Sequence, residues 1–82
     1  MDRVNIILGR LIKEKRKEIG MSQSLLAEKV GVTTQRIYYY EKGNRVIFIS
    51  LLFKICDVLN IDWASLKRTI EDEMISSVAW QR

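Results

Sequence analysis

Apolar residues recur along this chain at intervals of three and four, and the apolar–polar alternation typical of strands is nowhere sustained. The pattern predicts a first helix over residues 4–19, ended by Gly20, with one buried stripe formed by Ile7, Leu8, Leu11 and Ile12. Its other face is charged and includes Lys13 and Lys17, which we expect to be solvated. Proline is absent and only four glycines occur, so we expect an all-α fold.

Two short helices are predicted next, over residues 22–30 and 33–42, on either side of a tight turn at Gly31. A glycine suits this turn because a left-handed residue commonly ends a helix. The oxygens that can cap the two helices belong to Ser22 and to either Thr33 or Thr34. We expect the buried side of the pair to consist of Leu25, Leu26, Ala27, Val30, Ile37 and Tyr40.

A fourth helix is predicted to begin at Phe48 or Ile49 and to end near Leu59. Its inward stripe has helical spacing and consists of Leu52, Ile55, Cys56 and Leu59. Ile49 and Phe53 are also expected to face inward. The thiol of Cys56 should then behave as a small buried hydrophobe.

A fifth helix, capped by Asp62, is expected to pack Trp63 and Leu66 inward. The helical pattern continues toward the C-terminus in a four-residue repeat of Leu66, Ile70, Met74 and Val78. The predicted organisation is a single domain over residues 1–82, with a core of about 4–66 and a C-terminal helical extension over 67–82.

Charge is divided unevenly along the 82 residues, although the net charge is only +4. Residues 1–45 hold ten basic and five acidic side chains, whereas residues 46–82 hold four basic and five acidic ones. The excess positive charge therefore belongs to the half that contains the two short helices, which favours a polyanionic partner there.

The residue inventory also excludes several kinds of chemistry. Histidine is absent and there is one cysteine, so neither a disulfide within the chain nor a thiolate metal cluster is expected. The chain lacks a long apolar run and a secretory pattern at its N-terminus, so we expect a cytoplasmic protein that does not enter a membrane. We expect no enzymatic activity, no metal and no cofactor.

The chain resembles the helix-turn-helix domains of the Cro and phage-repressor type, also called the XRE family. The matching residues are Arg16, Gly20, Ser22, Gln23, Leu26, Ala27, Gly31, Val32, Ile37, Tyr40, Glu41, Gly43, Lys54, Ile55, Leu59, Asn60 and Ile61. The resemblance implies a compact five-helix bundle of the lambda-repressor-like type, similar in size to restriction–modification controller proteins and small phage repressors. In this family an arginine and a glutamate at the positions of Arg16 and Glu41 form an ion pair between the first and third helices. Two solvated charges are the alternative.

The third helix would be the one that reads DNA. When Ile37 and Tyr40 are set inward, the residues that turn outward are Gln35, Tyr38, Tyr39 and Lys42, with Thr34 and Arg36 on the flanks. The resemblance implies base contacts by Thr34, Gln35 and Tyr39, and Arg36 can pair with guanine or hold a phosphate. Glutamine pairs well with adenine, and a threonine methyl packs on a thymine methyl.

Contacts to the DNA backbone are expected on both sides of this helix. Ser22 and Gln23 begin the second helix, whose N-terminal N–H groups and dipole attract phosphate. The resemblance places a second set of backbone contacts at Lys42, Asn44 and Arg45. Tyr38 departs from the small polar residue usual in the family. It can stack on a sugar, donate to a phosphate or fill space beside the second helix.

One such domain covers about half a DNA site, so specific binding normally needs a dimer. The predicted core has no place for Ile47, Phe48 and Leu51. The family commonly has Pro-Ser where this chain has Ile47 and Phe48, so this chain also loses a helix cap. These three residues are the candidates for a dimer interface. They can instead fold back onto the last helix, whose own apolar stripe is a second candidate interface.

We therefore expect a sequence-specific, double-stranded DNA-binding transcriptional regulator, most simply a repressor or autoregulator, that acts as a homodimer on a palindromic operator. No residues remain for a ligand-sensing domain, so no small-molecule ligand is expected and the protein concentration would set the response. When bound to DNA, the protein would be associated with the nucleoid. The alternative is an antitoxin-type or protein-binding helix-turn-helix module, whose C-terminal segment engages a protein partner.

Overall fold

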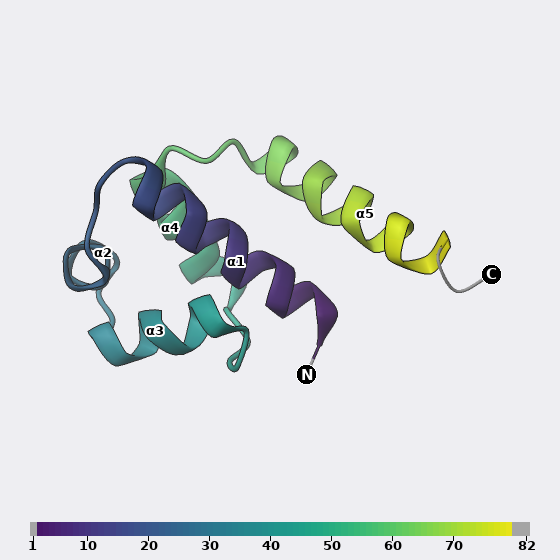
Figure 1. The fold of residues 1–82 in the computed structure, drawn as a ribbon. Coiled ribbons are helices and arrows are strands. Elements are labelled where there is room, and N and C mark those ends of the chain that lie inside the picture. The colour runs from purple at the N-terminus through teal and green to yellow at the C-terminus, as the bar shows by residue number, and fades with distance from the viewer. Residues whose placement is uncertain (1, 80–82) are drawn as a thin grey trace.

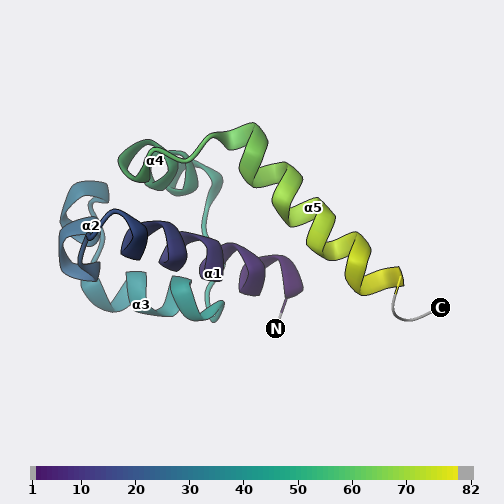
Figure 2. The same ribbon diagram turned by 45° about the horizontal axis from the view of Figure 1, so that its top comes forward.

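Five helices make up the computed structural model, which describes residues 2–79, with side chains up to Ser76. The helices are α1 (Arg3–Glu18), α2 (Gln23–Val30), α3 (Thr34–Lys42), α4 (Ile49–Leu59) and α5 (Trp63–Ala79). Helix α1 runs through the middle, with α3 along one side of it and α4 and α5 on the other, while α2 closes one end (Figures 1 and 2). No strand occurs among the residues described, so the predicted all-α fold is confirmed.

Side-chain caps explain where most of these helices begin. Asp2, Ser22, Thr33 and Asp62 each accept a hydrogen bond from a first-turn backbone N–H group, at distances between 2.9 and 3.1 Å. Helix α4 differs, because Phe48 stands at its N-cap and offers no side-chain hydrogen bond. The loss of a cap at this position, expected from the sequence, is thus present in the structure.

Left-handed residues explain where three of the helices end. Gly31 (φ 81°) ends α2 and Gly43 (φ 75°) ends α3, and each directs its N–H group back to a carbonyl of the last turn. Asn60 (φ 56°) ends α4 in the same conformation, which asparagine tolerates better than most residues. The short connections between α2, α3 and α4 therefore follow from local chemistry.

The core is a single cluster to which every helix contributes. Its members are Leu8, Ile12, Leu26, Ala27, Val30, Ile37, Tyr40, Leu52, Ile55, Cys56, Leu59 and Leu66. Ala27 is buried at 2% exposure, as expected for a small residue where two helices meet. Burial raises the pKa of the Cys56 thiol, and the charge of Asp57 adds to the effect, so Cys56 acts as a small hydrophobe.

Four residues that we expected to face inward are exposed. Leu25 is 40% exposed, Ile49 54%, Phe53 47% and Trp63 40%. On α4 the buried stripe is centred on Leu52, Ile55, Cys56 and Leu59, and Phe53 lies about 100° around the helix from Leu52, outside that stripe. Trp63 instead packs edge-to-face on Phe53, with 5.1 Å between ring centroids. The sequence prediction was wrong for these four residues because a stripe shows which face is buried but not how wide it is.

The three residues left over from the predicted core differ in their surroundings. Ile47 and Leu51 are half-buried and pack against the core, whereas Phe48 is 72% exposed. Only Phe48 among the three therefore presents most of its side chain to solvent.

Helix α5 continues well past the core, as the four-residue repeat predicted. Ile70 packs against the core, Met74 is half-buried and Ile75 is 67% exposed. An ion pair between Arg10 and Glu73 ties this part of α5 to α1. The side chain of Val78 and the last residues of the predicted extension, through Arg82, lie outside the described residues.

Neighbouring leucines on α2 provide a test of the core. Leu26 is completely buried and Leu25 is 40% exposed. We expect Leu26→Ala to lower the free energy of unfolding by about 2–5 kcal/mol, because it removes packed methyl groups and leaves a cavity. Leu25→Ala is the matched control and should cost less than about 1 kcal/mol. Urea unfolding of both variants measures the difference, and equal losses would contradict the arrangement of α2.

Candidate nucleic-acid interface

The outward face of α3 carries the residues that the sequence assigned to base reading. Thr34, Gln35 and Arg36 are exposed in its first turn, and Tyr39 is half-buried one turn later. Ile37 and Tyr40 are buried at 1% and 3% exposure and hold the opposite face against the core. The structure thus brings these four outward residues together on one short helix.

Tyr38 lies on the same exposed face and is not buried beside α2. It is 42% exposed, and its ring meets that of Tyr39 edge-to-face with centroids 5.5 Å apart. The Lys42 ammonium lies 4.9 Å from the centre of the Tyr38 ring, in cation–π geometry. A side-chain hydrogen bond with Tyr38 raises the pKa of Lys42. Two aromatic rings and a cation form a connected surface along α3.

A buried ion pair fixes α3 to α1. The Arg16 guanidinium donates two hydrogen bonds to the Glu41 carboxylate, from Nε to Oε2 at 2.6 Å and from Nη2 to Oε1 at 3.0 Å. The two side chains are only 8% and 2% exposed. Arg16 Nη1 also donates to the carbonyl oxygen of Met21, at 2.7 Å. Among the residues described, no buried side-chain nitrogen or oxygen lacks a partner.

Gln23 joins this pair instead of pointing freely into solvent. Its Nε2 donates to Glu41 Oε1 at 3.0 Å, so one carboxylate accepts hydrogen bonds from both α1 and α2. Gln23 is half-buried at the first position of α2. The network therefore links the beginning of α2 to the end of α3.

The other residues expected near phosphates lie at the two ends of the α2–α3 unit. Ser22 is exposed, and its hydroxyl caps α2. Lys42 ends α3, and the exposed Asn44 and Arg45 follow it. The backbone N–H of Asn44 donates to the Tyr39 carbonyl at 3.0 Å, which fixes the direction of the chain as it leaves α3.

Two glycines make close contacts between α1 and the end of α3 that the sequence analysis did not predict. Gly9 is buried in the middle of α1, and a Cβ placed on it would lie 2.2 Å from the Tyr40 carbonyl oxygen. A Cβ on Gly43 would lie 2.7 Å from the Cα of Ile6. The sequence did offer a sign of the contact at Gly9. A glycine inside a helix costs about 1 kcal/mol relative to alanine, so its presence there suggests that a larger side chain would not fit.

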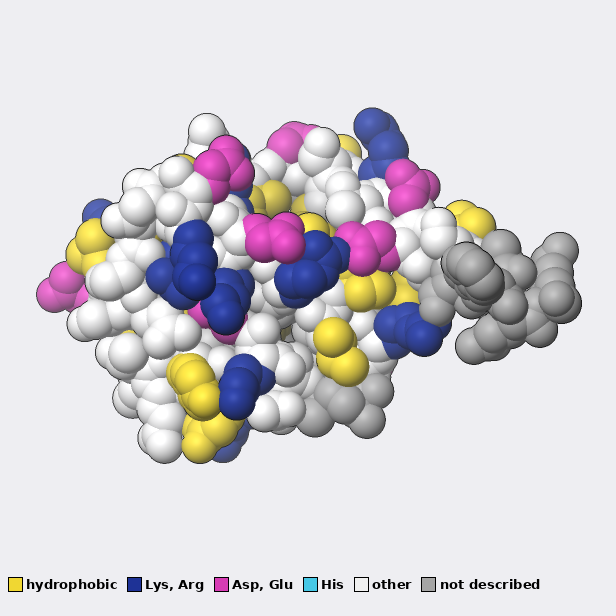
Figure 3. Space-filling view, viewed as in Figure 1, with side chains coloured by type: hydrophobic (Ala, Val, Ile, Leu, Met, Phe, Trp, Pro, Cys, Tyr) yellow, Lys and Arg dark blue, Asp and Glu magenta, His cyan; other side chains and the backbone are white. Residues whose placement is uncertain are grey.

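The charged surface of α1 continues beside this unit. Lys and Arg side chains gather over α1, and acidic side chains follow the boundary between α1 and α5 (Figure 3). Where the two signs meet, Arg10 pairs with Glu14 of its own helix, with 2.8 Å between Nη1 and Oε2, and with Glu73 of α5. These pairs are exposed and contribute little to stability.

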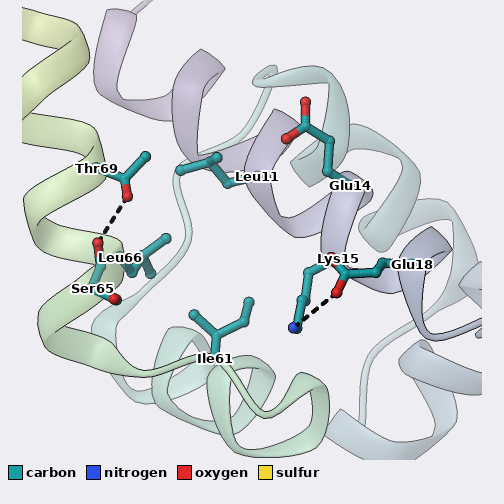
Figure 4. A pocket seen from close by; sticks show the side chains of 8 residues that line it. All are labelled: Leu11, Glu14, Lys15, Glu18, Ile61, Ser65, Leu66 and Thr69. Carbon is teal, nitrogen blue, oxygen red and sulfur yellow. Dashed lines mark hydrogen bonds and ion pairs between the residues drawn. The ribbon is translucent and has the colours of Figure 1, made fainter.

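An open groove of about 210 Å³ lies between α1 and α5, away from α3 (Figure 4). Leu11, Ile61 and Leu66 form its apolar part. The Lys15 ammonium bonds to Glu18 at 3.5 Å, and the Thr69 hydroxyl bonds to the carbonyl oxygen of Ser65 at 2.9 Å. Lys15, Glu18 and Thr69 are thus bonded within the groove, and the groove adds nothing to the α3 surface.

Within the part of the chain that the structure describes, no three His, Cys, Asp or Glu side chains are grouped closely enough to hold a metal ion. None of the described helices combines the length and apolar character needed to cross a bilayer.

Comparison with protein families decides the class of this domain. The model of the helix-turn-helix family matches residues 12–66. This chain belongs to the helix-turn-helix family. The match covers α2 and α3 together with most of the core, and the XRE-type resemblance expected from the sequence is confirmed. Helix-turn-helix domains of this family are DNA-binding modules and not enzymes, so the expectation of a non-enzymatic chain is confirmed for the matched domain.

Relatives by sequence are named as transcriptional regulators. An HTH-type transcriptional regulator of Sinorhizobium fredii, y4aM, is 40% identical over 58 residues, which is 71% of this chain and 41% of that protein. Another from Methanothermobacter thermautotrophicus is 47% identical over 49 residues, which is 60% of this chain and 71% of the relative. The matched part of this chain therefore spans only about two fifths of the length of the Sinorhizobium fredii regulator.

Solved structures with the same fold include two regulators. The clp gene regulator ClgR of Corynebacterium glutamicum superimposes with a TM-score of 0.84 at 21% identity, over 98% of this chain and 85% of the other. The restriction–modification controller protein C.Esp1396I superimposes with a TM-score of 0.79 at 24% identity, over 93% of this chain and 99% of the other. At these identities the likeness establishes the five-helix fold.

The buried pair is tested by comparing the same substitution at two arginines. Arg16→Met leaves the Glu41 carboxylate buried without its cation, and we expect a loss of about 3–5 kcal/mol in the free energy of unfolding. Arg10→Met breaks only exposed pairs and should cost less than about 1 kcal/mol. The double variant Arg16→Met, Glu41→Leu should recover part of the loss, because it leaves no charge buried. Denaturant unfolding of all three measures these values, and equal losses from the two arginines would contradict a buried pair.

Proposed function

We propose that this protein is a cytoplasmic transcriptional repressor or autoregulator that binds double-stranded DNA sequence-specifically, as a homodimer on a palindromic operator. The observation that carries the proposal is the outward face of α3, where exposed polar and aromatic side chains stand on a helix fixed from behind by the Arg16–Glu41 pair. A rigid helix with exposed hydrogen-bonding side chains is what the major groove of DNA accommodates.

Base reading is assigned to the first turns of α3. Gln35 can bond to both N6 and N7 of adenine, and the methyl group of Thr34 can pack on that of thymine. Arg36 lies beside them, and its Nη1 is 3.4 Å from the hydroxyl of Tyr40, which leaves its other N–H groups for guanine or phosphate. Tyr39 would contact the groove one turn later.

Phosphates are assigned to the two ends of the α2–α3 unit. The amide nitrogen of Gln23 carries two hydrogens, and one of them is given to Glu41, so the second remains for a phosphate near the start of α2. Tyr38, Lys42, Asn44 and Arg45 would hold the backbone at the other end. These contacts orient the protein without reading sequence.

A dimer is proposed because one copy reads only half a site, and two copies must be spaced about 34 Å apart along the DNA. Exposed apolar side chains occur from the loop before α4 to the start of α5: Val46, Phe48, Ile49, Phe53 and Trp63, which we call the α4–α5 patch. Phe53 and Trp63 pack on each other, and exposed apolar side chains in this number are costly in water unless another molecule covers them. Of the three interface candidates expected from the sequence, Phe48 belongs to the α4–α5 patch. Ile47 and Leu51 pack against the core and would contribute to the interface only indirectly.

Base reading and phosphate binding are separated by comparing two alanine variants of α3. We expect Gln35→Ala to lower the preference for the operator over unrelated duplex by about 5- to 150-fold, without changing the salt dependence. Lys42→Ala should weaken binding to both duplexes and reduce the salt slope by about one. The operator is first obtained by selecting duplexes from a random library with the wild-type protein. Selection of no preferred sequence would refute specific DNA binding, and an unchanged preference in Gln35→Ala would refute its assignment.

The dimer surface is tested by placing a charge on each of two equally exposed apolar residues. Phe48 is 72% and Ile75 is 67% exposed. We expect Phe48→Glu to give a folded monomer, because a carboxylate cannot be buried in an apolar interface without a partner. Ile75→Glu should remain dimeric. Sedimentation velocity distinguishes the two states, and a monomer from Ile75→Glu alone would move the interface to the end of α5.

A further inference from the structure

The backbones of α1 and α3 touch at Gly9. A Cβ on Gly9 would lie 2.2 Å from the carbonyl oxygen of Tyr40 and 2.8 Å from that of Glu41. Both atoms belong to the backbone of a helix, so no side-chain rotation can relieve the overlap. Any larger residue at position 9 must therefore move the last turn of α3 away from α1.

A second close contact between α1 and α3 lies at Gly43, the residue that ends α3. Gly43 has a positive φ of 75°, and a Cβ there would lie 2.7 Å from the Cα of Ile6, one turn before Gly9. The two helices thus meet backbone to backbone at two points. The carboxylate of Glu41 is held separately by Arg16 and Gln23. Glu41 is consequently held at two points. The ion pair holds its side chain, and its backbone carbonyl lies against Gly9.

Any displacement of this last turn reaches the reading face of α3. Tyr39 and Lys42 flank the two residues that touch Gly9. Thr34 lies seven residues before Glu41, about 10 Å along the helix axis, so a small tilt at one end becomes a larger displacement at the other. Hydrogen bonds to bases weaken steeply when donor and acceptor depart from about 3 Å.

We propose that Gly9 is a positioning residue for DNA recognition: its missing side chain sets the depth at which α3 docks on α1, and thereby the selectivity for the operator. The inference rests on the proposed function, because it concerns the same reading helix. Gly9 lies behind α3 and touches no DNA. It acts only through the backbone of Tyr40 and Glu41.

The test compares Gly9→Ala with Ile55→Val, a mild core change on α4, and measures affinity for the selected operator and for unrelated duplex at one salt concentration. Gly9→Ala is expected to lower the operator preference by about tenfold or more, as for a lost bidentate base contact. The salt slope should stay unchanged, because the long, flexible side chains of Lys42 and Arg45 can still reach phosphates after a small shift of the helix. Ile55→Val should keep the wild-type preference.

Folding of Gly9→Ala is checked by its circular dichroism and thermal melt. Should the single variant not fold, the double variant Gly9→Ala, Asn60→Gly replaces it, with Asn60→Gly as its control. A glycine relieves the positive φ of Asn60, which ends α4 and is not part of the contact between α1 and α3, and so adds stability.

The outcomes separate this inference from the proposed function. An unchanged operator preference in folded Gly9→Ala, or an equal loss of affinity for both duplexes, would overturn the positioning role while the protein remained a specific DNA binder. Failure of the wild-type protein to select any duplex would instead remove the proposed function and the inference with it.

Discussion

The structure depends on one buried ion pair. Arg16 and Glu41 are almost completely shielded from water, and their two parallel hydrogen bonds fix both the distance and the angle between α1 and α3. Gln23 and the carbonyl of Met21 complete the network, so α1, the turn after it, α2 and α3 all meet at this pair. Burying two charges costs much of what their attraction returns. The main effect of the pair is therefore geometric: it allows α3 only one orientation.

Helix α3 needs such support because it has only nine residues and would not be stable alone in water. Local signals start and stop it, through the Thr33 cap and Gly43, and two buried side chains hold its inner face. Its position relative to the rest is set by α1, through the ion pair and through the backbone contacts at Gly9 and Gly43. The outer face is thereby left exposed, and it carries the connected side chains of Tyr38, Tyr39 and Lys42.

Charge and exposed apolar surface are distributed differently over the two halves of the chain. The basic side chains concentrate in residues 1–45, around α2 and α3. The exposed apolar side chains of the α4–α5 patch follow immediately, before and on α4, which begins without a side-chain cap, and at the first residue of α5. This arrangement supports a proposal in which one half meets a polyanion and the other meets a second copy. The groove between α1 and α5 belongs to neither surface.

The sequence alone determined the class of fold, the five helices to within a residue or two, and most of the core, because periodicity, caps and left-handed glycines are local properties. It also led to the helix-turn-helix family and to the pairing of Arg16 with Glu41, through the family resemblance. Periodicity could not show that Phe53 and Trp63 would pack on each other at the surface. Nor could it show that Gln23 would bond to Glu41, or that Gly9 would lie against Tyr40. Only the tertiary structure decided these, because each depends on how two separate helices pack against each other, which their local sequences do not specify.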